Sequence, residues 1–241
     1  MKFIIPSAFL IICSVVGIYQ FFACKTGGDE RVAAAYREKT FVLDSLFQNA
    51  GSKRGNKAFI RVFKTEKELE LWVENTELSA YVLLKTYPIC AASGELGRKL
   101  REGDRQVPEG CYEIAQYNPE SSYWLSLGLN YPNDADKKVA DPENPGSDIF
   151  IHGHCASIGC MAMTDDCIKE IYLVALEARK QANVSVYIFP FRMTETNLTS
   201  YAALMPQNAD FWQHLQSIYS FLEEKKQIPI VKIEDNGFYS L

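Results

Sequence analysis

Apolar and polar positions alternate in short runs along much of the chain, while a few longer stretches repeat their apolar positions every three to four residues. The alternating runs predict strands over residues 59–63, 80–86, 111–117, 122–129, 148–151, 184–189 and 228–233. The helical spacing predicts helices over residues 29–48, 164–176 and 208–222. Strands and helices of this kind, mixed along one chain, indicate an α+β fold.

Two helix starts carry recognisable capping residues. Thr65 is followed three residues later by a glutamate, a capping box that predicts a short helix through Glu74. Thr164 precedes Asp165 and Asp166, whose negative charge suits the first turn of a helix. We therefore expect both aspartates to stabilise the helix that Thr164 opens.

The N-terminus differs from the rest of the chain. Residues 3–23 are almost unbroken apolar sequence behind Lys2, about the length that spans a bilayer. We expect export to the periplasm or cell envelope, with residues 1–24 as an uncleaved membrane anchor, a cleaved signal peptide, or a lipoprotein signal with lipid on Cys24. Residues 25–56 then form a membrane-proximal helix and linker, and residues 57–241 form the catalytic domain.

Composition narrows the function only slightly. The chain of 241 residues has a net charge of −5, and a nucleic-acid partner would call for a basic face, so none is expected. The apolar and charged fractions are those of an ordinary globular protein.

One short run concentrates the reactive side chains. Two of the three histidines and two of the seven cysteines lie between Ile149 and Asp166. A thiol is a useful nucleophile as thiolate, and a neighbouring imidazole generates it at neutral pH. If the strand and the following turn form a hairpin, His152 can face Cys160, and the amide groups of Gly159 and Cys160 can receive the charge of an oxyanion.

Two other chemistries were weighed for the same run. His152, His154, Cys155 and Cys160 supply the atom types of a zinc site. On a regular strand, however, the adjacent His154 and Cys155 point to opposite faces, so no metal is expected. Ser157 lacks the glycines that flank a serine nucleophile, and we expect its hydroxyl to stabilise the turn and to help bind an acyl group.

The motif resembles the catalytic signature of the YkuD-type L,D-transpeptidases, and in particular their YafK-like branch. The pattern His-Gly-x-Cys-x-Ser-Ile-Gly-Cys-x-Ala-Met-Thr-Asp of that branch is matched from His152 to Asp165. Further similar segments are Lys85–Cys90, Glu102–Tyr112 and Phe189–Thr194. The chain departs from most of the wider family in its short gap before Cys160, in Ile158 and in lacking the usual arginine after the cysteine.

The resemblance implies both a fold and an activity. The fold is an L,D-transpeptidase-like β-sandwich or strongly bent mixed sheet with flanking helices. The activity is that of a cysteine transpeptidase acting on peptidoglycan tetrapeptide stems in cell-wall remodelling, with no cofactor. Cys160 is the expected nucleophile, His152 the general base, and the Gly159 amide the oxyanion donor. Candidate substrate-binding residues are Ser157, Gly153, Tyr87, and two cations for stem carboxylates, Lys85 and Arg192.

Several questions stay open at this point. The acyl acceptor can be an amine, which gives a cross-link or anchors a protein, or water, which gives carboxypeptidase or amidase activity and can release wall-linked protein. A catalytically idle peptidoglycan-binding protein is a further alternative. Four cysteines, Cys90, Cys111, Cys155 and Cys167, allow three disulfide connectivities, or are small buried apolar residues.

Overall fold

The computed structural model describes residues 27–241. Its elements are, in order, α1 (Gly27–Asn49), β1 (Ala58–Phe63), β2 (Glu68–Asn75), β3 (Ala80–Pro88), β4 (Gly110–Asn118), β5 (Ser126–Leu129), a 3-10 turn (Asp136–Lys138), β6 (Phe150–His152), β7 (Met161–Ala162), α2 (Asp165–Ala178), β8 (Ser185–Phe189), α3 (Glu195–Leu204), a 3-10 turn (Pro206–Asn208), α4 (Ala209–Lys225), β9 (Lys232–Ile233) and β10 (Tyr239–Ser240). The apolar segment at residues 3–23 and Cys24 lie outside the described residues. Within residues 27–241, no helix has the length and apolar character needed to cross a bilayer.

Eight strands form one mixed sheet in the order β3-β2-β1-β8-β4-β5-β6-β7. The pairs β1–β8 and β6–β7 are parallel, and the other pairs are antiparallel. The sheet curls until the chain leaving β3 meets β7, where Ala91 pairs with Ala162. These observations confirm the predicted α+β class and the bent mixed sheet with flanking helices.

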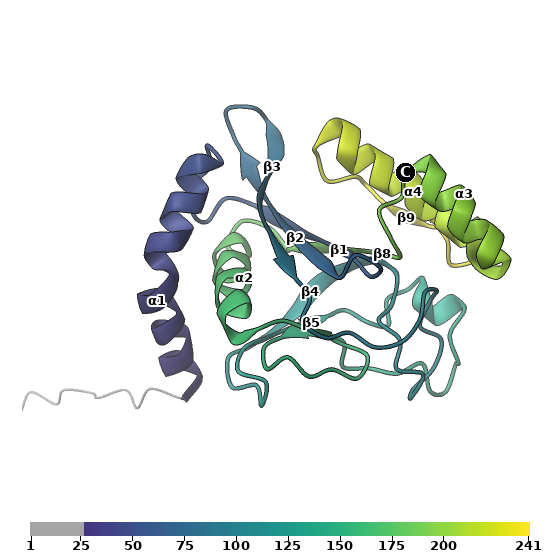
Figure 1. Cartoon of the computed structure of the whole chain (residues 1–241), viewed down its shortest axis with the longest axis horizontal. Helices are drawn as coiled ribbons and strands as arrows, with labels where there is room; N and C mark the ends of the chain where they lie inside the picture. Colours follow the sequence, from purple (N-terminus) through teal and green to yellow (C-terminus); the bar gives the residue numbers. More distant parts are fainter. Residues whose placement is uncertain (1–26) are drawn as a thin grey trace, which may run out of the picture.

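Helices cover both faces of the central strands. Figure 1 shows α1 and α2 on one side of the sheet and α3 and α4 on the other. Along β1, Ile60 and Val62 join the core beneath α2, whereas Phe59 and Phe63 join the aromatic core beneath α4. Because both faces are buried, the strand is apolar at nearly every position.

The capping box at Thr65 does not start a helix, so that prediction is wrong. Residues Glu68–Asn75 form β2, in which Leu69 and Leu71 enter the core beneath α2. The Glu70 carboxylate points to the other face, where it accepts hydrogen bonds at 2.6 Å from Arg61 Nη2 and at 2.9 Å from Trp72 Nε1. Pairing with β1, including the buried ion pair of Arg61 and Glu70, therefore outweighs the local capping signal of Thr65 and Glu68.

The C-terminal third differs from the sequence expectation in two further elements. Helix α3 was not predicted, although the Thr194 side chain caps it by accepting from the Asn197 amide. The predicted closing strand at residues 228–233 shrinks to β9, which pairs only with β10 in a separate two-stranded sheet. The helix starting after Asn208 is confirmed as α4.

Helix α1 packs along α2 and contributes Ala35, Leu43 and Phe47 to the core. The Lys39 ammonium lies 2.6 Å from an oxygen of Asp166 and 3.2 Å from an oxygen of Glu170, both on α2. The predicted helix over residues 29–48 is thus confirmed, and it docks on the sheet domain through apolar contacts and paired charges.

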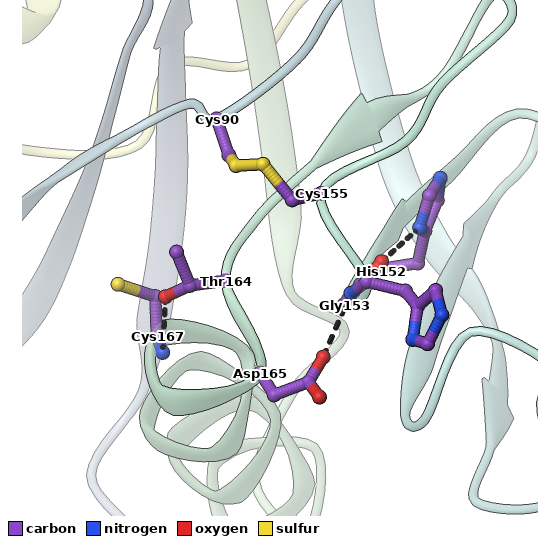
Figure 2. The surroundings of a disulfide bond; sticks show 8 residues. Cys90, His152, Gly153, Cys155, Thr164, Asp165 and Cys167 are labelled. Atoms are coloured by element: carbon purple, nitrogen blue, oxygen red, sulfur yellow. Dashed lines mark hydrogen bonds between the residues drawn. A yellow bond between two sulfur atoms is a disulfide. The ribbon is translucent and has the colours of Figure 1, made fainter.

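A disulfide joins Cys90 and Cys155 where the two ends of the curled sheet meet. Cys90 follows β3, and Cys155 lies in the loop between β6 and β7 (Figure 2). Cys111 and Cys167 are free thiols. This pairing, one of the connectivities that the sequence left open, ties the loop after His152 to the opposite end of the sheet.

Removing this cross-link is expected to destabilise the domain. Its partners are 65 residues apart, so the Cys90→Ser, Cys155→Ser double variant should lose about 2–4 kcal/mol of unfolding free energy. Urea unfolding of the described domain measures the change. Cys167→Ser, which alters a free and partly exposed thiol, is the control and should change stability by less than about 1 kcal/mol. Equal urea midpoints for the double variant and the control would show that the disulfide does not contribute to the unfolding free energy.

Candidate active site

His152 ends β6 and is 3% exposed. Its Nδ1 lies 2.6 Å from the Gly153 carbonyl oxygen. Because a carbonyl can only accept, Nδ1 carries the proton and Nε2 keeps its lone pair. The Tyr123 ring lies against the imidazole, with the ring centroids 4.6 Å apart. The imidazole is thus held as the tautomer that a general base requires.

Cys160 precedes β7, directly after Gly159, whose φ of 85° lies in the left-handed region that favours glycine. Its thiol donates to the Asp148 carbonyl oxygen at 3.4 Å. Within residues 27–241, no hydrogen bond joins this sulfur to His152. The thiol must therefore turn from Asp148 toward the imidazole before His152 can take its proton.

Burial sets the ionisation of both groups. Desolvation lowers the pKa of His152 below its ordinary value, and the Gly153 hydrogen bond offsets this in part. Desolvation likewise raises the pKa of the Cys160 thiol. The resting pair at neutral pH is accordingly a neutral imidazole and a protonated thiol.

His152 and Cys160 line one pocket of about 540 Å³, which is large enough for a peptide segment. Its wall is rich in hydroxyl groups and includes Phe150 and the largely exposed Ile158. Among residues 27–241, Asp148 is the one acidic residue that lines it, and no lysine or arginine of that range does. A second cleft of about 600 Å³ lies beside Cys111 and Tyr239 and contains neither reactive residue.

The two amides predicted to hold an oxyanion are occupied in this conformation. Gly159 N–H donates to Ser93 Oγ at 2.6 Å, and Cys160 N–H donates to Ser157 Oγ at 2.9 Å. Ser157 Oγ also donates to the Cys160 carbonyl at 2.6 Å, so its hydroxyl stabilises the turn. Before these amides can bind an oxyanion, the hydroxyls of Ser93 and Ser157 must move away from them.

Four of the five candidate substrate-binding residues do not line this pocket, and three of these have their polar groups paired elsewhere in the protein. Lys85 Nζ is 2.6 Å from Glu170 Oε2, and the buried Tyr87 donates to the same oxygen at 3.1 Å. Arg192 is engaged by the carboxylates of Glu68 and Glu70. The structure therefore places Lys85 and Tyr87 beneath α2, and Arg192 beside β2, with their polar groups paired within the protein.

Gly153 lies beside His152 but does not itself line the pocket. A Cβ added to it would come 2.6 Å from Asp165 Oδ1 and 2.9 Å from the Tyr123 carbonyl oxygen. Its role in this structure is close packing behind the imidazole. Cys155, which was weighed as a zinc ligand, has its sulfur bonded to Cys90.

Sequence reasoning missed Tyr123, Asp148 and Ser93. Tyr123 fell inside a predicted strand that in fact begins at Ser126, so its position in a turn against His152 was hidden. Asp148 contacts the thiol through its backbone carbonyl, which any residue could supply. Ser93 comes from a loop 66 residues before Gly159, and no local pattern marks that contact.

A curled mixed sheet that brings a cysteine and a histidine onto one pocket is the type of site at which cysteine acyltransferases act. Residues 57–188 match the YkuD family, described as the L,D-transpeptidase catalytic domain. The chain belongs to this family. It is 38% identical over 189 residues to Escherichia coli strain K12 YafK, a protein named provisionally as an L,D-transpeptidase; the match covers 77% of this chain and 74% of YafK.

Two solved structures are similar in fold at lower identity. The helical cell shape determining protein Pgp2 of Campylobacter jejuni has 19% identity and a TM-score of 0.43, with 80% of each chain covered. Bd1075 of Bdellovibrio bacteriovorus has 22% identity and a TM-score of 0.41, with 56% of this chain and 48% of Bd1075 covered.

The raised pKa of Cys160 predicts how its alkylation depends on pH. Iodoacetamide reacts with the thiolate, so its rate at Cys160 should reach half its maximum above pH of about 8.5, the ordinary thiol value. Peptide mass spectrometry separates Cys160 from the free thiols Cys111 and Cys167. A half-maximum near neutral pH would instead indicate a resting thiolate and imidazolium pair.

Proposed function

We propose that this chain is a cysteine-dependent L,D-transpeptidase that acts on peptidoglycan stem peptides through a Cys160 thioester. The observation that carries the proposal is that His152 and Cys160 line one peptide-sized pocket. Nδ1 of His152 is hydrogen-bonded to the Gly153 carbonyl oxygen, so Nε2 is available as the base. The family membership supports stem peptides as the substrate class.

The first half of the reaction forms the acyl-enzyme. Substrate binding turns the Cys160 thiol from Asp148 to His152, whose Nε2 takes its proton. The thiolate attacks the carbonyl carbon of the L,D-peptide bond, and the oxyanion is held by backbone amides of the turn. The carbon–nitrogen bond breaks, the imidazolium gives its proton to the leaving nitrogen, and D-alanine departs from a thioester.

The second half transfers the acyl group. An amine of a second stem attacks the thioester, loses a proton to His152, and the thiol is regenerated with a new amide bond. Asp148, which lines the pocket, attracts an acceptor that arrives as an ammonium group, and this group gives one proton to solvent before its nitrogen attacks the thioester. Water as acceptor gives instead a shortened stem or a protein released from the wall.

We further propose an exported location in the cell envelope. The apolar residues 3–23 provide a targeting or anchoring segment. The Cys90–Cys155 disulfide supports the same location, because structural disulfides persist mainly in oxidising compartments.

Turnover of defined disaccharide-tetrapeptides tests the function. With the described domain, mass spectrometry should show dimers or shortened stems, and Cys160→Ala or His152→Gln should lower the rate by at least about a thousandfold. Cys167→Ala, which removes a thiol outside the pocket, is the matched control and should keep the wild-type rate.

The products also separate the alternatives. Dimers identify an amine acceptor, and shortened stems identify water. Slow alkylation of Cys160 fits both an enzyme and an idle binding protein, because burial raises the thiol pKa in either case. Stem binding without any acyl-enzyme mass or product would therefore refute the enzymatic proposal in favour of the binding module.

A further inference from the structure

One peptide group behind the imidazole is held from both sides. The Gly153 carbonyl oxygen accepts from His152 Nδ1 at 2.6 Å. The amide of the same peptide unit, His154 N–H, donates to Asp165 Oδ1 at 2.7 Å. Figure 2 shows both bonds as dashed lines, one ending at the His152 ring and the other at the Asp165 carboxylate, with Gly153 between them.

We propose that Asp165 is a positioning residue for His152, acting through the Gly153–His154 peptide group. A carboxylate that accepts from a peptide N–H fixes the plane of that peptide and polarises its carbonyl toward greater negative charge. The Gly153 carbonyl then points at Nδ1 of His152 and accepts a stronger hydrogen bond from it. The chain thus uses a carboxylate to orient its catalytic histidine without direct contact between the two side chains.

The surroundings are built to allow this close approach. Gly153 has no room for a side chain, since a Cβ would lie 2.6 Å from Asp165 Oδ1. The two residues that follow, His154 and Cys155, have positive φ values of 73° and 40°. This conformation is unfavourable for residues with a Cβ, so other contacts must hold it. The Asp165 bond holds one of the pair, and the disulfide to Cys90 holds the other.

Helix capping does not account for the Asp165 carboxylate. The Thr164 side chain already caps α2 by accepting from Cys167 N–H at 3.2 Å. Asp166 places a second negative charge in the same turn and pairs with Lys39. Asp165 Oδ1 instead reaches back across the loop to His154. The expectation that both aspartates stabilise the helix stays a prediction, and it leaves the orientation of Asp165 unexplained.

This difference between adjacent aspartates provides a matched pair of variants. Asp165→Ala and Asp166→Ala each remove one carboxylate from the first turn of α2, but only the first breaks the bond to His154. Asp165→Asn keeps an oxygen that can accept from His154 and loses only the charge.

The inference rests on the proposed role of His152 as base, so it is tested by turnover and by a measurement independent of turnover. With disaccharide-tetrapeptides, Asp165→Ala should lower kcat about tenfold at nearly constant KM, a modest loss because Asp165 is exposed. Asp165→Asn should lie between it and wild type, and Asp166→Ala should match wild type.

Nitrogen NMR of labelled histidine reports the tautomer of His152 directly. The chain has three histidines, and His154→Gln and His214→Gln assign the signals. Wild type and Asp166→Ala should show Nδ1 protonated, and Asp165→Ala should show a mixture of tautomers. An unchanged tautomer in Asp165→Ala, or equal loss of kcat in both alanine variants, would overturn the inference. If wild type turns over no stem, the proposed function fails, while the tautomer still decides the role of Asp165.

Discussion

The closure of the curled sheet is the constraint on which the rest of this structure depends. Strands β3 and β7 lie at opposite ends of an eight-stranded order, yet the chain after β3 pairs with β7 through Ala91 and Ala162. That meeting point brings the segment after β3, which carries Cys90 and Ser93, beside the loop after His152, which carries Cys155 and Gly159. The pocket, the turn of the nucleophile and the disulfide all form beside it.

The local structure of residues 149–166 could be predicted because its signals are local. A short apolar stretch, a glycine at a turn and a threonine before two aspartates gave β6, the Gly159 turn and the start of α2. The YkuD motif added the assignment of Cys160 as nucleophile and His152 as base, which stays a prediction. These features depend on residues that are close together in the chain, so they can be read from a single sequence.

Features that depend on distant partners could not be predicted in the same way. The capping box of Thr65 and Glu68 made β2 look like a helix, and only the fold reveals that Arg61 lies opposite Glu70 on a neighbouring strand. A sequence likewise does not show that Lys85 pairs with Glu170, or that Arg192 pairs with Glu68 and Glu70. The choice of Cys155 as the partner of Cys90 likewise follows from sheet closure, which brings their Cα atoms to 5.3 Å.

The position of Cys155 also has a consequence for how the protein matures. In the unfolded chain, Cys155 lies five residues from Cys160 but 65 residues from Cys90. Loop-closure entropy then favours the short pairing, which would consume the nucleophile. The Cys90–Cys155 disulfide becomes favourable once the sheet has closed and Cys90 lies beside Cys155. Oxidation before folding should therefore favour a Cys155–Cys160 bond, whereas oxidation after folding leaves the thiol of Cys160 free, as it is in this structure.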